Sequence, residues 1–265
     1  EEVRAMASGL AELGFKRGDN LAIIGDNRPR LYWAMCAAQC LGGVPVPLYQ
    51  DAVAAEMIFV LQDAGIKFAI VEDQEQVDKL LENMAQCPGL QHILYDDPRG
   101  MRHYNQPFLH GLDEVQEMGR IHNRNHPEFI DGEIDLGKPE DVAVMLYTSG
   151  TTGKPKGVCQ THAAFIAAAQ SGCEFDKLVP EDNILSYLPM AWVGDHLFSF
   201  AQATYAGFTI NCPESGDTVM TDMREIGPSY YFAPPRVFEN LLTQVMIRME
   251  DASAIKRNLF HTFMG

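Results

Sequence analysis

The chain has 265 residues, of which 46% are hydrophobic, so it can bury a substantial core in one large domain or two small ones. Its formal net charge of −16 argues against a nucleic-acid partner, because binding to a phosphate backbone requires a clustered positive surface. A small phosphate site is not excluded, since surface charges are screened over about 8 Å at physiological salt.

Strand-like and helix-like segments alternate in the first part of the chain. Short β-branched or apolar runs predict buried strands, and apolar residues spaced three and four apart predict helices. The expected order is strand 21–24, helix 31–41, extended segment 44–49, helix 54–61, strand 68–71 and helix 77–84. This alternation favours an α/β fold with mostly parallel sheets flanked by helices in layers, joined by right-handed crossovers.

Residues 96–140 are polar and show only weak periodicity. We expect this stretch to be a surface excursion or a boundary between sublobes. His122 and His126 lie four residues apart and could in principle share a metal ion. Because Pro127 follows and the surroundings are polar, we interpret them as solvated loop histidines.

Regular patterns resume after residue 140. A strand is predicted at 142–147, followed by a loop and a helix that carries Phe165, Ile166 and Ala169. The remaining elements expected are short strands at 184–188, 208–211 and 230–232 and a helix at 238–249.

Cysteine usage and hydropathy indicate where the protein works. The six cysteines show none of the paired short spacings of a zinc site or a disulfide framework, so we expect reduced thiols. No apolar run approaches the ~20 residues that span a bilayer, and no signal peptide is visible at the start. We therefore expect a cytoplasmic location. The chain opens at Glu1 inside an amphipathic pattern, which indicates a fragment.

The stretch with the clearest chemistry is residues 147–157, Tyr-Thr-Ser-Gly-Thr-Thr-Gly-Lys-Pro-Lys-Gly, between a hydrophobic strand and a predicted helix. Its three glycines allow close backbone turns, so that successive N–H groups can converge on an anion. Four hydroxyl side chains and two lysines surround them, which is the composition of a phosphate-binding loop. A Gly/Thr-rich connection without a ligand is the alternative.

This loop is not a Walker-type P-loop. Only two residues separate Gly150 from Gly153, and Pro155 follows Lys154 where that loop has Ser or Thr. The string as a whole resembles the phosphate-binding signature of the adenylate-forming superfamily, which includes acyl-CoA synthetases, luciferases and peptide-synthetase adenylation domains. The resemblance implies that the chain is an incomplete N-terminal AMP-binding domain spanning residues 1–265.

By the same resemblance, one set of residues would hold the β- and γ-phosphates of ATP, with Lys156 as the basic position and Thr148 also reaching Mg²⁺. The set is Thr148, Ser149, Gly150, Thr151, Thr152, Gly153 and Lys156. Among these, Thr148 and Lys156 are our candidate catalytic residues.

Other segments resemble the long-chain fatty acyl-CoA synthetases in particular. These are residues 18–19, 27–29, 46–49, 188–191 and 234–239. In that branch the segment corresponding to 188–191 is usually followed by His, whereas Trp192 follows here. We assign Trp192, His196 and Arg236 to the substrate pocket. Trp192 stands at the position of the family histidine, and compensation by His196, four residues later, is the less favoured alternative. Trp192 could equally fill the core, so the acyl chain length stays open.

The resemblance implies a reaction in which a fatty acid attacks ATP to give an acyl adenylate and pyrophosphate, after which coenzyme A displaces AMP. ATP, Mg²⁺, coenzyme A and a fatty acid are the implied partners. Loose membrane contact is compatible with this reaction, although no basic amphipathic helix supports it. Elements that the family carries further along the sequence are not in this chain, so we expect the isolated piece to be inactive. The alternatives are an aryl or short-chain acid ligase, an acyl-AMP ligase, or a non-catalytic nucleotide- or acyl-binding module.

Overall fold

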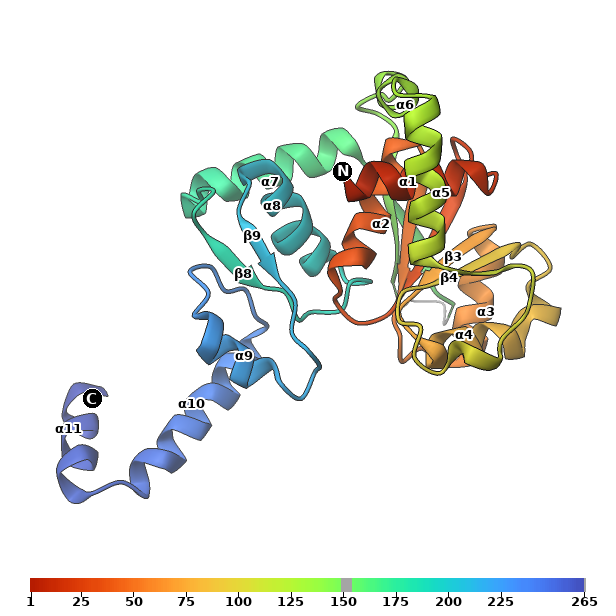
Figure 1. Cartoon of the computed structure of the whole chain (residues 1–265). Coiled ribbons are helices and arrows are strands. Elements are labelled where there is room, and N and C mark those ends of the chain that lie inside the picture. The colour runs from red at the N-terminus through yellow and green to blue at the C-terminus, as the bar shows by residue number, and fades with distance from the viewer. Residues whose placement is uncertain (149–153, 265) are drawn as a thin grey trace. The chain divides into compact units, whose positions relative to one another are not determined.

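The computed structural model describes residues 1–148 and 154–264 (Figure 1). Contacts divide the chain into two compact units, residues 1–229 and residues 230–265, and each is described by itself. The first unit contains a five-stranded sheet, a separate β-hairpin and a second small sheet. The second unit consists of helices.

All five strands of the main sheet run parallel, in the spatial order β2-β1-β3-β4-β5. Their bounds are β1 Asn20–Ile24, β2 Val44–Leu48, β3 Phe68–Val71, β4 His92–Tyr95 and β5 Leu109–Gly111. The predicted α/β class and the strands expected at 21–24, 44–49 and 68–71 are confirmed. The order reverses direction between β1 and β3, which makes their carboxyl ends a topological switch point.

Helices cover both faces of this sheet. On one face lie α1 (Glu2–Glu12), α2 (Pro29–Cys40) and α5 (Leu112–Asn125), and on the other lie α3 (Ala54–Asp63) and α4 (Gln74–Asn83). Alternate residues of β1 point to the two faces, with Leu21 and Ile23 in the first core and Ala22 and Ile24 in the second. The sheet is therefore buried on both sides, as parallel sheets require.

Two prolines determine where this sheet stops. Val44 donates its backbone N–H to Asp19 O at 2.9 Å, so the alternate N–H positions on β2 face β1. Pro45 and Pro47 occupy the intervening positions, which face away from β1 and have no N–H to donate. The neighbouring strand β6 (Val142–Thr148) lies beside β2 but pairs instead with β7 (Lys156–Thr161) in an antiparallel hairpin.

Residues 96–140 hold more regular structure than their polar sequence indicated. They contain β5, α5, the helix α6 (Phe129–Asp135) and a short 3-10 turn η2 (Met101–His103). The buried positions of α5 include Gln116 and Gly119, which weaken the hydrophobic periodicity that marks a helix. His122 lies on α5 and pairs with Glu12, so it is not a loop residue.

The rest of the first unit follows the hairpin. It contains α7 (His162–Asp176), the parallel pair β8 (Asn183–Leu185) and β9 (Thr209–Asn211), the π-helical segment η3 (Asp195–Ala201), α8 (Gln202–Ala206) and α9 (Val219–Ile226). The 3-10 turn η1 (Met84–Gln86) extends α4. The strands expected at 184–188 and 208–211 form, but they are shorter.

The second unit contains α10 (Pro235–Glu250) and α11 (Ala254–Met264). The strand expected at 230–232 is not among the elements formed, and the helix expected at 238–249 is confirmed as part of α10. All six cysteines are free, as predicted. Within residues 1–148 and 154–264, no helix combines the length and the apolar character needed to cross a bilayer.

A buried carboxylate joins the main sheet to the later part of the first unit. Asp195 is 1% exposed and accepts hydrogen bonds from Tyr32 Oη at 2.8 Å and from Ser186 Oγ at 2.6 Å. Asn27 Nδ2 lies 3.2 Å from Asp195 Oδ1 and donates to Leu188 O at 3.0 Å. Residues separated by more than 150 positions in the chain therefore meet at one polar centre.

We predict a specific pH dependence for this centre. Burial raises the pKa of Asp195 from 3.8 to about 6, although its hydrogen bonds act in the opposite direction. Between pH 3.8 and about 6, Asp195 is mostly protonated in the folded chain and mostly ionised in the unfolded chain. Raising the pH through this range therefore favours the unfolded chain and lowers the free energy of unfolding. The full effect is about 3 kcal/mol. In Asp195→Asn this contribution should disappear, because the amide does not titrate and the Tyr32 and Ser186 hydroxyls can turn to accept.

Urea unfolding at several pH values between 4 and 7 checks this prediction. The difference in free energy of unfolding between wild type and Asp195→Asn should change with pH, and exposed Asp217→Asn serves as the control. A difference that stays constant over this range would show that the carboxylate is ionised throughout.

A second prediction concerns the contact between α1 and α5. A Cβ added at Gly119 would lie 1.7 Å from Ala5 O and 2.7 Å from Gly9 N, both of which are backbone atoms. The helices would have to separate, so Gly119→Ala should destabilise the chain by about 1–3 kcal/mol. At Gly132, in the middle of α6, nothing lies within 4 Å of the added Cβ, and Gly132→Ala should stabilise by roughly 0.5–1 kcal/mol. Equal unfolding midpoints for the two variants would contradict the close packing.

Candidate functional site

The predicted phosphate loop joins the two strands of the β6–β7 hairpin. Thr148 ends β6 and pairs with Lys156, which begins β7, and Tyr147 pairs with Gly157. Ser149, Gly150, Thr151, Thr152 and Gly153 lie outside the described residues. We expected the motif to lie between a strand and a helix, and this was wrong, because β7 intervenes before α7. The run from Lys156 to Thr161 is short and mixed in polarity, so the sequence pattern did not predict a strand there.

The hairpin brings together two of the predicted site residues. Thr148 and Lys156 are cross-strand neighbours at the point where the loop leaves the hairpin, and both are exposed. A hydroxyl and an ammonium group therefore stand at the two ends of the loop, and both are groups that can bind a phosphate.

Opposite faces of β6 pack on different cores. Val144 and Leu146 belong to a small cluster with Phe165 of α7. Met145 and Tyr147 pack against the core formed around α3 and α4. The hairpin is thus held between α7 on one side and α3 on the other.

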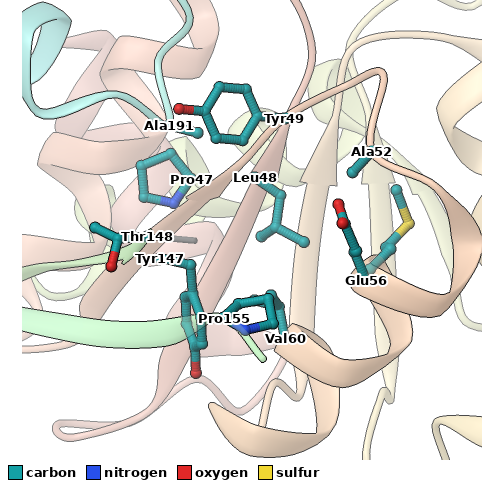
Figure 2. Close-up of a pocket in the computed structure, with 11 residues that line it drawn as sticks. Pro47, Leu48, Tyr49, Ala52, Glu56, Val60, Tyr147, Thr148, Pro155 and Ala191 are labelled. Carbon is teal, nitrogen blue, oxygen red and sulfur yellow. The ribbon is translucent and has the colours of Figure 1, made fainter. Parts of the chain in front are cut away.

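A cavity of about 160 Å³, here called the hairpin cavity, opens beside the loop (Figure 2). It is lined by residues 47–49 at the carboxyl end of β2, by Tyr147, Thr148 and Pro155 of the hairpin, by Ala191, and by Ala52, Glu56, Met57 and Val60 on and before α3. Figure 2 shows Thr148 and Glu56 on opposite sides of this space. Its walls are mainly apolar, and Glu56 is its one carboxylate among the lining residues.

The segment that resembles the acyl-pocket wall reaches the same cavity. Ala191 lines the cavity beside Thr148, and Trp192 follows directly in the chain. Trp192 is half-buried, and its ring lies over Gly194, where an added Cβ would meet ring carbons at 2.2 Å. Gly194 therefore permits the ring position that Trp192 adopts.

His196 points to a different place. It is fully buried between Phe165 and Phe200, with ring centroids 4.8 and 5.0 Å away, and it lines a second cavity of about 390 Å³ between α2, α7 and η3. Burial lowers its pKa to about 3, so the imidazole is neutral at physiological pH. The structure does not bring His196 to the hairpin cavity, which leaves its role as a substitute histidine a prediction.

Arg236 lies in the first turn of α10 and is exposed. It belongs to the second unit, so the structure describes its helix but does not relate it to the hairpin cavity. Its assignment to the substrate pocket stays a prediction.

The topological switch point of the main sheet is filled by the protein itself. Arg28 follows β1 and forms an ion pair with Glu72, which follows β3, with Nε and Oε1 2.8 Å apart. Arg28 also donates to the carbonyl oxygens of Pro213 and Glu214 at 2.8 and 2.9 Å. Burial raises the pKa of Glu72 despite the nearby guanidinium. These contacts occupy the place where open α/β sheets often bind ligands, which leaves the hairpin as the better candidate.

The described residues fit Mg²⁺ only together with an anionic ligand. Mg²⁺ prefers oxygen ligands and usually combines one or two protein groups with substrate phosphates. Thr148 supplies a hydroxyl at the loop, and in residues 1–148 and 154–264 no three His, Cys, Asp or Glu side chains gather around one point. Such a metal ion would therefore be held by Thr148 and by the phosphates that the loop binds.

Sequence reasoning missed the residues that hold the hairpin from α3. Tyr147 Oη donates to Asp63 Oδ2 at 2.7 Å, and Lys154 Nζ lies 5.9 Å from the centroid of the Phe59 ring. Asp63 and Phe59 lie four residues apart on one face of α3, but they are more than 80 positions from the motif and gave no signal in the sequence.

Comparisons with known proteins show the family of the chain. The model of the AMP-binding enzyme family matches residues 1–262. The chain is 24% identical over 265 residues to the long-chain-fatty-acid–CoA ligase ACSBG1 of Rattus norvegicus, covering 97% of this chain and 36% of the rat protein. It also resembles the fatty acyl-CoA synthetase A of Dictyostelium discoideum, at 28% identity over 97% of this chain and 38% of that protein. The chain spans little more than a third of the length of the curated relatives it matches.

Among solved structures, the anthranilate CoA ligase AuaEII in complex with anthranoyl-AMP matches with a TM-score of 0.75 at 18% identity, covering 88% of this chain and 43% of that one. This likeness shows that the two chains share a fold.

Proposed function

Because the chain belongs to the AMP-binding enzyme family, we propose that the intact natural protein is a fatty acyl-CoA synthetase. It would join a fatty acid to ATP as an acyl adenylate, release pyrophosphate, and then transfer the acyl group to the thiol of coenzyme A. The observation that carries the proposal is the family match over residues 1–262 together with the hairpin that places Thr148 beside Lys156.

The geometry supports a role in binding the triphosphate. Lys156 is exposed at the start of β7, where its ammonium group can neutralise charge on the departing pyrophosphate. Thr148 stands across the hairpin, where its hydroxyl can bind a phosphate oxygen or Mg²⁺. Ser149, Gly150, Thr151, Thr152 and Gly153 would supply further amides and hydroxyls. The metal ion, when bound, would draw negative charge from the phosphates.

The fatty acid is the proposed acyl substrate because of the relatives' names and the apolar surroundings of the loop. The hairpin cavity has mainly apolar walls next to Thr148, and the Ala191–Trp192 segment borders it. Each methylene that becomes buried contributes about 0.8 kcal/mol, so an apolar pocket selects strongly between short and long acids. The cytoplasmic location and the loose membrane contact expected from the sequence are part of this proposal.

Pyrophosphate exchange with a panel of acids tests the function. The intact protein, MgATP and labelled pyrophosphate are incubated with palmitate, acetate or benzoate. Exchange with palmitate supports activation of a long-chain acid, and formation of palmitoyl-CoA after addition of coenzyme A then distinguishes a synthetase from an acyl-AMP ligase. Exchange with benzoate or acetate alone identifies an aryl or short-chain ligase, and no exchange with any acid points to a non-catalytic module.

We predict that Lys156→Ala in the intact protein lowers the exchange rate by about 100-fold, because a charge that stabilises the transition state is lost. The exchange assay at saturating palmitate measures this. Lys138→Ala removes another exposed lysine, 18 positions earlier, and should leave the rate unchanged. An exchange rate that survives Lys156→Ala would remove this lysine from the phosphate site.

A further inference from the structure

Both ends of the phosphate loop are attached to one helix. Tyr147, two residues before Ser149, donates its hydroxyl to Asp63 at the end of α3. Lys154, the first described residue after the loop, places its ammonium over Phe59, one turn earlier on the same helix. Since residues four apart share a helix face, Asp63 and Phe59 present one surface to the hairpin.

Tyr147 is well held at this contact. Its ring packs against the core around α3 and α4, and burial, with the Asp63 carboxylate beside it, raises the pKa of the Tyr147 hydroxyl. The hydroxyl therefore remains a hydrogen-bond donor at all physiological pH values.

The last glycine of the motif makes room for this tyrosine. Gly157 lies opposite Tyr147 in the hairpin, and an added Cβ would stand 3.1 Å from Tyr147 Cζ and 3.0 Å from Met145 Sδ. Any larger residue would press on the ring that reaches Asp63. The packing of Tyr147 and Met145 therefore favours glycine at position 157, independently of phosphate binding.

We propose that α3 is the platform that positions the two ends of the hairpin, Thr148 and Lys156, with Asp63 acting through Tyr147 and Phe59 acting through Lys154. These are positioning residues, because each acts through a residue of the hairpin. The proposal rests on the proposed function for its effect on ATP, and on the contacts of Tyr147 and Lys154 with α3 for the attachment. A hydroxyl and an ammonium group that are held in place before a phosphate arrives cost less entropy to order when it binds.

The experiment measures kinetics on the intact protein for four variants. Asp63→Ala and Tyr147→Phe each break the hydrogen bond, and each should lower kcat/KM for ATP about tenfold. Asp63→Ala should leave KM for the fatty acid unchanged, because Asp63 is not among the residues that line the hairpin cavity. The double variant should be no worse than either single one, because both remove the same interaction. Asp63→Asn keeps an acceptor oxygen and should restore most of the wild-type value.

Gln62→Ala is the matched control. Gln62 is the neighbour of Asp63 on α3 and makes a hydrogen bond of similar length, 2.6 Å, but to Gln86 O rather than to the hairpin. Its removal should leave KM for ATP unchanged. If Asp63→Ala and Tyr147→Phe behave like Gln62→Ala, or if Asp63→Ala raises KM for both substrates alike, the positioning role is wrong.

Amide hydrogen exchange across residues 142–161 separates this inference from the proposed function. Asp63→Ala should speed exchange in the hairpin at least fivefold relative to Gln62→Ala, whether or not the protein activates an acid. A protein with no exchange of pyrophosphate but with a loosened hairpin in Asp63→Ala would overturn the function and keep the attachment. If the protein activates an acid but hairpin exchange is unchanged in Asp63→Ala, the proposed function is kept and the attachment to α3 is overturned.

Discussion

The hydrogen bonds that meet at the buried side chain of Asp195 fix how distant parts of the first unit are arranged. Asp195 accepts hydrogen bonds from Asn27 and Tyr32, which follow β1, and from Ser186, which follows β8. Two sheets that are far apart in the sequence therefore share one polar centre. A buried charge is costly, and although each of these side chains supplies a donor, the raised pKa of Asp195 shows that the donors offset only part of that cost. The carbonyl of Leu188, just before the segment that lines the hairpin cavity, is fixed by the same asparagine.

Much of the main sheet could be predicted because its strands are short apolar runs and its first helices have wide apolar faces. The helix α5 was missed for the opposite reason. It approaches α1 so closely that glycine and glutamine occupy buried positions where leucine would mark a helix. The strand β7 was missed because it pairs with only one neighbour and keeps an exposed, mixed surface.

The candidate site was predictable only in its local part. The motif itself indicated phosphate binding, and the hairpin confirms that Thr148 and Lys156 are neighbours. Contacts between distant parts of the chain leave no local sequence pattern. The hydrogen bond of Tyr147 to Asp63 depends on where β6 lies beside α3. His196 lies in a π-helical segment, where ordinary helical spacing does not predict the direction of a side chain. Single-chain periodicity contains neither piece of information.

The prolines of β2 also bear on how the molecule avoids self-association. An exposed strand edge with a full row of N–H groups can recruit a strand from another copy and begin an aggregate. Pro45 and Pro47 remove the donors from one outer edge of the main sheet, and β5 leaves only three residues, Leu109–Gly111, at the other. With β6 lying beside β2 and only a short strand at the other border, neither edge presents a long row of free donors to a strand of another copy.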